Sequence, residues 1–394
     1  MANTYLNKTL GTATNRKKFT ISVWFKKCNN SNAQYLASAG TDVSSVIDDL
    51  SIHSSQALNF SGYESGTTYG LRTNALLRDN SAWYHAVVSF DSTQTTSTDR
   101  LKMYLSGEEI TSFSSTTYPS LNLEVQFNKN VEHMVGRNLG GTNYFNGSMS
   151  HIHFIDGTAY DATAFGEYDA NGVWKIKTSP SVTYGTNGFF ILKDGNSVTD
   201  QSGNSNNFTV GGGTLTKTED SPSNVFATMN VLSKGSGISI SNGNTTISNG
   251  SGDKSIVGTI ACASGKYYWE AKCTNATTYA NIGVTLSSAD GSTHSSVDAG
   301  RIAYENGGSV YREGLSGQGN TSGLATFTTN DIISVAFDTE NGTLSFYKNG
   351  TLINTTTDND LLFSNNEYLP CNGINNGGWS YNFGNGYFGT TAVS

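Results

Sequence analysis

Apolar and polar residues alternate along much of this chain, and this two-residue period restricts its fold more than any other feature. The alternation is clearest in three groups: Phe19, Ile21, Val23 and Phe25; Ala86, Val88 and Phe90; and Ile333, Val335 and Phe337. Successive side chains of a strand point to opposite faces, so this pattern indicates strands that bury one face. We therefore predict an all-β protein.

Tight-turn sequences separate these apolar segments. The chain contains eleven Asn-Gly and three Asp-Gly dipeptides, which supply the positive φ angles of two-residue hairpin turns. No segment of helical length combines a 3.6-residue apolar period with capping residues. We expect helix only in short turns, and stacked antiparallel sheets elsewhere.

Composition excludes several functional classes. Aromatic residues make up 11% of the chain and charged residues 14%, the reverse of a disordered protein. The net charge of −8 disfavours a nucleic-acid partner. No run approaches the roughly 18 apolar residues of a membrane span, so we expect no membrane insertion. The cysteines form no C-x-x-C pair, which predicts buried, reduced thiols: Cys28, Cys262, Cys273 and Cys371.

A sequence echo indicates two related domains. A strand ending in Asp91 and an L-x-Φ-Y-x-x-G segment ending in Gly107 are matched by a strand ending in Asp338 and a segment ending in Gly350. An aspartate that starts a turn usually bonds its own backbone, so we assign both aspartates to turn geometry.

The domain boundaries follow from a change in composition. Residues 181–229 are rich in Asn and Gly but include the apolar run 189–192, which favours an ordered connector, packed on the first domain, over a flexible tether. We predict β-sandwich domains at 1–180 and 230–394.

Several motifs resemble two known families. Four segments occur in the order found in laminin G-like domains of the concanavalin A-like superfamily: Phe19-Thr-Ile-Ser-Val-Trp24, Trp83-Tyr-His85, Leu101-Lys-Met-Tyr104 and Phe145-Asn-Gly147-Ser-Met149. The C-terminal part is similar to a SPRY domain in three segments: Gly265-Lys-Tyr-Tyr-Trp269-Glu270, Leu344-Ser-Phe-Tyr347-Lys-Asn-Gly350 and Tyr381-Asn-Phe-Gly384. The resemblance implies two concanavalin A-like jelly-roll sandwiches and accounts for the echo.

Other blocks resemble virion proteins of marine tailed phages. These blocks are Phe154-Ile-Asp156-Gly157, Gly172-Val-Trp174, Tyr184-Gly-Thr-Asn-Gly188 and Asp220-Ser-Pro222. The resemblance implies a phage virion component, assembled in the bacterial cytoplasm and oligomeric in the particle, that serves as a fibre, spike or surface decoration. Its implied partners are other capsid or tail proteins and host-surface glycan.

No catalytic motif stands out. Concanavalin-type glycosidases need paired carboxylates on one strand face, and the near match here, Glu167-Tyr-Asp169, runs into a turn without a third acid. We predict a protein that binds without catalysis and has no catalytic residues. The alternative is a glycan-degrading tail depolymerase of the same fold.

Two segments carry possible metal ligands. His151 and His153 share a strand face, a spacing that can bind zinc, but no third ligand is near, so we favour an outward-facing surface or interface pair. Asp194, Asp200 and Asn204 form the oxygen-rich loop that calcium prefers, with Asp200 as the leading ligand. Calcium is thus the one candidate cofactor, and turn geometry is the alternative for this loop.

Aromatic residues in Gly- and Asn-rich segments are the candidate ligand- or partner-binding residues. They are Tyr304, Tyr311, Arg312, Trp379 and Tyr381, placed between strands or at strand ends, where sandwich loops gather. Tyr, Trp and Arg are common interface anchors. The alternative is that half of them pack inward as core; we assign Trp24 and Trp269 to core or intersheet packing.

Overall fold

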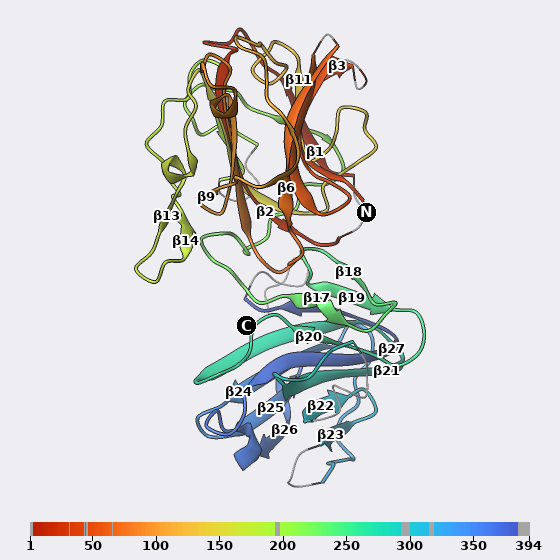
Figure 1. The fold of residues 1–394 in the computed structure, drawn as a ribbon. Helices are drawn as coiled ribbons and strands as arrows, with labels where there is room; N and C mark the ends of the chain where they lie inside the picture. Colours follow the sequence, from red (N-terminus) through yellow and green to blue (C-terminus); the bar gives the residue numbers. More distant parts are fainter. Residues whose placement is uncertain are drawn as a thin grey trace. The chain divides into compact units, whose positions relative to one another are not determined.

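The computed structural model describes residues 3–30, 32–42, 44, 46–64, 66–193, 198–292, 300–314 and 319–384, and its fold is all-β, as predicted. The helical segments within these ranges are three 3₁₀ turns: η1 (Ser97–Asp99), η2 (Ala162–Ala164) and η3 (Asn359–Leu361). None of the described helices has the length and apolarity needed to cross a membrane. The chain divides into two compact units, Met1–Asn224 and Val225–Ser394 (Figure 1).

Unit 1 is a sandwich of two antiparallel sheets. In the described residues, one sheet has eight strands in the order β10 (Phe113–Thr117), β6 (Thr67–Leu76), β5 (Ala57–Glu64), β4 (Val46–Ile52), β3 (Gln34–Asp42), β11 (Glu132–Val135), β1 (Tyr5–Thr9) and β16 (Thr209–Gly212). The other has six, in the order β15 (Phe189–Ile191), β12 (Gly147–Asp156), β2 (Lys18–Lys27), β7 (Tyr84–Asp91), β8 (Leu101–Leu105) and β9 (Glu108–Glu109). Between the sheets lies the core, which includes Phe19, Ile21, Val23 and Phe25 as the alternation predicted.

The segment 181–229 is largely part of this sandwich. Strand β15 pairs with β12, and β16 pairs with β1, so the segment adds an edge strand to each sheet. Further along, Asp220 Oδ2 lies 2.9 Å from Lys26 Nζ, and both side chains are buried. Trp83 Nε1 donates to Asp220 Oδ1 at 3.3 Å. These pairings make the segment a structural element of unit 1.

The six-stranded sheet is buried on both faces, which alternation alone did not predict. All residues of β2 from Phe19 to Lys27 are buried. A second, smaller cluster covers the face away from the main core, and it contains Val87, Tyr104, Ile155, Ala162 and Phe165. The hairpin of β13 (Gly166–Tyr168) and β14 (Trp174–Ile176), drawn in yellow-green in Figure 1, belongs to this covering layer through Trp174.

Unit 2 is built around two long strands, β21 (Lys266–Leu286) and β27 (Tyr368–Asn382), which pair with each other over most of their length. Register shifts near residues 273–279 of β21 divide the pairing into two halves. The first half of β21 continues into β24 (Ile332–Asp338), β25 (Thr343–Lys348) and β26 (Thr351–Thr357). The second half continues into β22 (Arg301–Glu305) and β23 (Ser309–Glu313).

Strand β27 extends the sandwich of unit 2 on its other side. It pairs with β20 (Lys254–Gly258), which carries β17 (Met229–Lys234), and with β19 (Thr246–Asn249), which carries β18 (Ser239–Ser241). The predicted inward residues Ile333, Val335 and Phe337 lie in the core of this unit.

The sequence echo corresponds to two hairpins, β7–β8 and β24–β25. Asp91 Oδ1 accepts the backbone N–H of Thr93 at 3.0 Å, and Asp338 Oδ1 accepts that of Asn341 at 3.1 Å. Both aspartates therefore shape turns, which confirms the assignment to turn geometry.

All four cysteines are buried thiols. Burial raises the pKa of Cys262 to about 12 and that of Cys273 to about 11. These thiols stay protonated at neutral pH and act as small core residues.

We expect Asp220→Ala to destabilise unit 1 by about 3–5 kcal/mol, because it leaves the Lys26 ammonium buried without its partner. The control is Glu124→Ala, which breaks the solvent-exposed pair with Arg16 and should cost about 0–1 kcal/mol. Urea unfolding of the full chain measures both. If both substitutions lower the free energy of unfolding by the same amount, the buried Lys26–Asp220 pair contributes no more to stability than an exposed pair.

Acid should weaken unit 1 through His85, whose side chain is fully buried. Burial lowers the pKa of His85 from 6.5 to about 3. The unfolded chain therefore binds this proton first, and stability falls as pH drops below 6.5 toward the folded-state pKa. Over that range the wild type should lose about 1.4 kcal/mol per pH unit more than His85→Gln. Urea unfolding at a series of pH values measures the free energy of unfolding of both proteins. If the wild type and His85→Gln lose stability in parallel as the pH falls, the fold does not keep His85 neutral.

Candidate binding site

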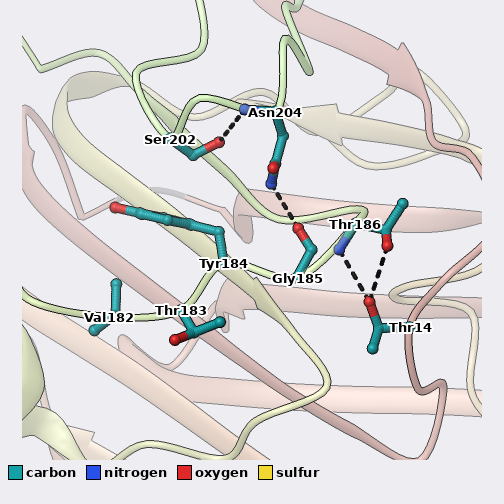
Figure 2. A pocket seen from close by; sticks show the side chains of 8 residues that line it. All are labelled: Thr14, Val182, Thr183, Tyr184, Gly185, Thr186, Ser202 and Asn204. Carbon is teal, nitrogen blue, oxygen red and sulfur yellow. Dashed lines mark hydrogen bonds between the residues drawn. The ribbon is translucent and has the colours of Figure 1, made fainter.

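An open depression on unit 1 is the candidate binding site among the described residues (Figure 2). Its lining comes from three separate segments: Thr14; Val182, Thr183, Tyr184, Gly185 and Thr186; and Ser202 and Asn204. The hydroxyls of Thr14 and Thr186 lie 3.0 Å apart on one side, and Tyr184 lies on another (Figure 2). The lining carries hydroxyl, amide and aromatic groups and no charge, a composition suited to a small uncharged polar group.

Asp200 holds one wall of the depression. Its Oδ1 accepts the backbone N–H groups of Phe190 and Ser202, each at 2.8 Å. Its Oδ2 accepts the backbone N–H of Asn206 and the hydroxyl of Ser202, each also at 2.8 Å. Four donors thus occupy the lone pairs with which a carboxylate would bind a cation.

The other calcium candidates do not change this result. Asn204 donates its amide to the carbonyls of Gly185 and Gly188, at 2.6 and 2.9 Å. Asp194 lies outside the described residues. Within the described ranges no group of three or more His, Cys, Asp or Glu side chains could hold a metal ion. Among the described residues, the hydrogen bonds of Asp200 favour the turn geometry that was the alternative, and a calcium role for Asp194 stays a prediction.

A second buried carboxylate, Asp156, holds the wall that carries Thr14. It accepts the backbone N–H groups of Thr14, Asn15 and Asn187 at 2.6, 3.1 and 3.0 Å, and the side-chain amide of Asn128 at 2.6 Å. Burial alone would raise the pKa of Asp156, but these hydrogen bonds outweigh it and hold the pKa below its ordinary value. Sequence reasoning missed this role, although Asp156-Gly157 was visible as a turn dipeptide.

The histidine pair lies inside unit 1, which corrects the expected outward-facing pair. His151 and His153 are 3% and 1% exposed. His153 stacks on Phe190 with ring centroids 3.9 Å apart, and its Nδ1 lies 2.9 Å from the hydroxyl of Tyr184. Burial and the neighbouring His151 lower the pKa of His153 well below 6.5. The expectation failed because later segments of the chain cover this sheet face.

The acidic pair considered for glycosidase chemistry is held by lysines. Glu167 Oε2 lies 3.8 Å from Lys177 Nζ, and Asp169 Oδ2 lies 3.9 Å from Lys175 Nζ. Asp169 Oδ1 also accepts the backbone N–H of Val173 at 2.9 Å, which closes the tip of the β13–β14 hairpin. Both acidic side chains therefore lie on a solvent-accessible hairpin.

The described part of unit 1 has three serine–histidine contacts, His53–Ser55, Ser150–His151 and Ser22–His85. In the last of these the histidine tautomer argues against a serine nucleophile. Ser22 Oγ lies 2.8 Å from His85 Nε2, and Trp174 Nε1 lies 3.0 Å from His85 Nδ1. The indole nitrogen can only donate, so Nδ1 accepts and the neutral ring carries its proton on Nε2. His85 therefore donates to Ser22 and cannot remove its proton. Both side chains are fully buried.

The structure corrects the expected positions of three candidate residues in unit 2. Tyr304 lies in β22, and Trp379 and Tyr381 lie in β27. They are 0%, 0% and 4% exposed and belong to the core. They occupy the inward positions of their strands, so the core alternative applies to all three.

The other two candidates lie side by side in β23 and differ in exposure. Tyr311 is half-buried on the outer face of this strand. Arg312 pairs with Asp358, with both side chains less than 10% exposed, and so links β23 to the residue before η3. Of the five candidates, Tyr311 keeps an accessible side chain, and its binding role stays a prediction.

Comparison with known proteins agrees with this two-unit architecture. A family model of the concanavalin A-like lectin/glucanases superfamily matches residues 2–162, and the SPRY domain model matches residues 266–385. A search of curated proteins finds no match.

Two solved structures are similar to part of the chain. The crystal structure of the SPRY domain of human HERC1 is 19% identical, with 39% of this chain and 96% of that chain covered and a TM-score of 0.32. The stonustoxin structure is 18% identical, with 40% of this chain and 27% of that chain covered and a TM-score of 0.31. The two family matches alone support a laminin G-like domain of the concanavalin A-like superfamily in residues 2–162 and a SPRY domain in residues 266–385.

Proposed function

We propose that this chain is a non-enzymatic binding protein of a phage virion, a fibre, spike or surface decoration that contacts host-surface glycan or neighbouring virion proteins. The pairing of a concanavalin A-like lectin/glucanase domain with a SPRY domain carries the proposal. SPRY domains generally mediate protein–protein interactions, so this pairing favours recognition. The virion assignment rests on the resemblance of the blocks at 154–174 and 220–222 to phage proteins.

The chemistry of the described residues supports binding over catalysis. Glu167 and Asp169 pair with lysines, and His85 donates to Ser22. A retaining glycosidase needs two carboxyl groups roughly 5 Å apart across a sugar, one of them with a raised pKa. The depression in Figure 2 has no carboxylate in its lining.

The virion assignment predicts that the chain is on the outside of the mature particle. Antibody against the purified chain should label intact virions in electron micrographs, and mass spectrometry of purified virions should detect the chain. The same antibody applied to virions of an unrelated tailed phage is the control. If the chain is present in infected cells but missing from purified virions, the virion assignment is wrong.

The binding assignment predicts that the chain releases no reducing ends from host polysaccharide, even after long incubation. The matched variant is Glu167→Gln combined with Asp169→Asn. Reducing ends that appear with the wild type and disappear with this variant would establish the depolymerase alternative instead.

A further inference from the structure

We propose that the outer face of a sheet in unit 2 binds an uncharged glycan through two tyrosine rings. This tyrosine face consists of Tyr268 and Glu270 on β21, Ser334 and Ala336 on β24, and Ser345 and Tyr347 on β25. The inference deepens the proposed function, because it rests on glycan as one of the chain's ligands and names the surface that takes it.

The strand register places these side chains together. Tyr268 lies opposite Ala336, which lies opposite Ser345. In the next row, Glu270 lies opposite Ser334, which lies opposite Tyr347. Their chain neighbours Trp269, Val335 and Phe346 belong to the core. Since side chains alternate along a strand, the six residues of the tyrosine face point away from the core.

The ring of Tyr268 is exposed but held in place. Tyr268 is 55% exposed, whereas tyrosines in folded proteins are usually more buried. The hydroxyl donates to Glu270 Oε1 at 2.7 Å, and Asn382 Nδ2 donates to Glu270 Oε2 at 3.3 Å. Glu270 is 2% exposed, so this carboxylate acts as a buried positioning group. A ring fixed before binding loses less conformational freedom when a ligand arrives.

The charges in and around the tyrosine face balance, which fits an uncharged ligand. At one border of the tyrosine face, Lys266 Nζ lies 3.3 Å from Asp338 Oδ2. Glu270 and Lys272 occupy alternate positions of β21 and carry opposite charges. An acidic polysaccharide or a strongly charged protein would find no complementary field here.

Sugar chemistry matches the remaining groups better than a protein surface does. A protein interface usually has a large apolar anchor at its centre, whereas the middle strand here presents only the half-buried Ala336 beside a buried Ser334. The two tyrosines stand on strands two apart and in adjacent rows, so their Cα atoms are roughly 12 Å apart on a diagonal. An extended glycan that runs along this diagonal meets both rings. Ser345 and Thr355, whose hydroxyls lie 2.9 Å apart on neighbouring strands, can bond its hydroxyl groups.

Calorimetric titration of the full chain tests this proposal. The probes are hexasaccharides of β-1,3-linked glucose, β-1,4-linked glucose and β-1,4-linked mannose, with a hexamer of galacturonic acid as the acidic comparison. We expect at least one neutral probe to bind and the acidic one not to. Tyr268→Ala should weaken that binding about tenfold or more, and Tyr268→Trp should retain it.

The matched control is Tyr168→Ala, which removes a 47% exposed tyrosine of unit 1 and should leave the affinity unchanged. Unfolding curves of each variant verify that it is folded. The proposal is overturned if no neutral probe binds, if the acidic probe binds better, or if Tyr268→Ala binds as well as the wild type. It is also overturned if Tyr268→Ala disrupts binding only to a virion protein. Virion labelling does not depend on these titrations. If the chain is present in virions but binds no glycan, this inference is wrong and the virion assignment still holds.

Discussion

The burial of alternate apolar side chains between paired sheets is the constraint on which the rest of this structure depends. Each strand satisfies its backbone through ladders with its neighbours, so its side chains are free to divide between a core face and an outer face. Phe19 and Phe25 in unit 1, and Val335 and Phe346 in unit 2, occupy core faces in this way. The outer faces then become available for covering layers or for ligands.

The two units use their outer faces differently. In unit 1 the chain returns after β12 and covers the outer face of the six-stranded sheet with the small cluster around Phe165. Buried carboxylates secure the returning segments, since Asp156, Asp200 and Asp220 each accept several donors from them or from the sheet. In unit 2 the outer face of β21, β24 and β25 keeps Tyr268 exposed. The first arrangement gives rigidity, and the second leaves a surface on which recognition can occur.

The alternation predicted the fold class and the core faces from sequence, but it could not show what packs on an outer face. Ser22 and His85 alternate with core residues and so lie on the outer face of the sheet, yet both are fully buried beneath the covering layer. Glycine was also misleading. The Asn-Gly pairs at 372–373 and 376–377 lie inside β27 rather than in turns. A Cβ on Gly378 would lie 2.6 Å from Thr274 Oγ1, so glycine there permits close strand approach.

The candidate site residues were harder to predict for the same reason. Trp379 follows two glycines and looked like a loop residue, but its strand position directs it into the core. Asp200 was found from its Asx-rich loop, whereas its hydrogen-bond donors, including Phe190, come from separate positions that only the fold brings together. Tyr268 carried a usable signal, because it lies between the core residues of an alternating strand.

Hydrogen–deuterium exchange of the full chain, with and without a bound neutral hexasaccharide, tests most directly whether this protein works by recognition on a preformed sheet surface. The account predicts slower exchange in β21, β24 and β25, and an unchanged saccharide recovered afterwards. Protection centred instead on the β13–β14 hairpin, together with a shortened saccharide, would contradict it.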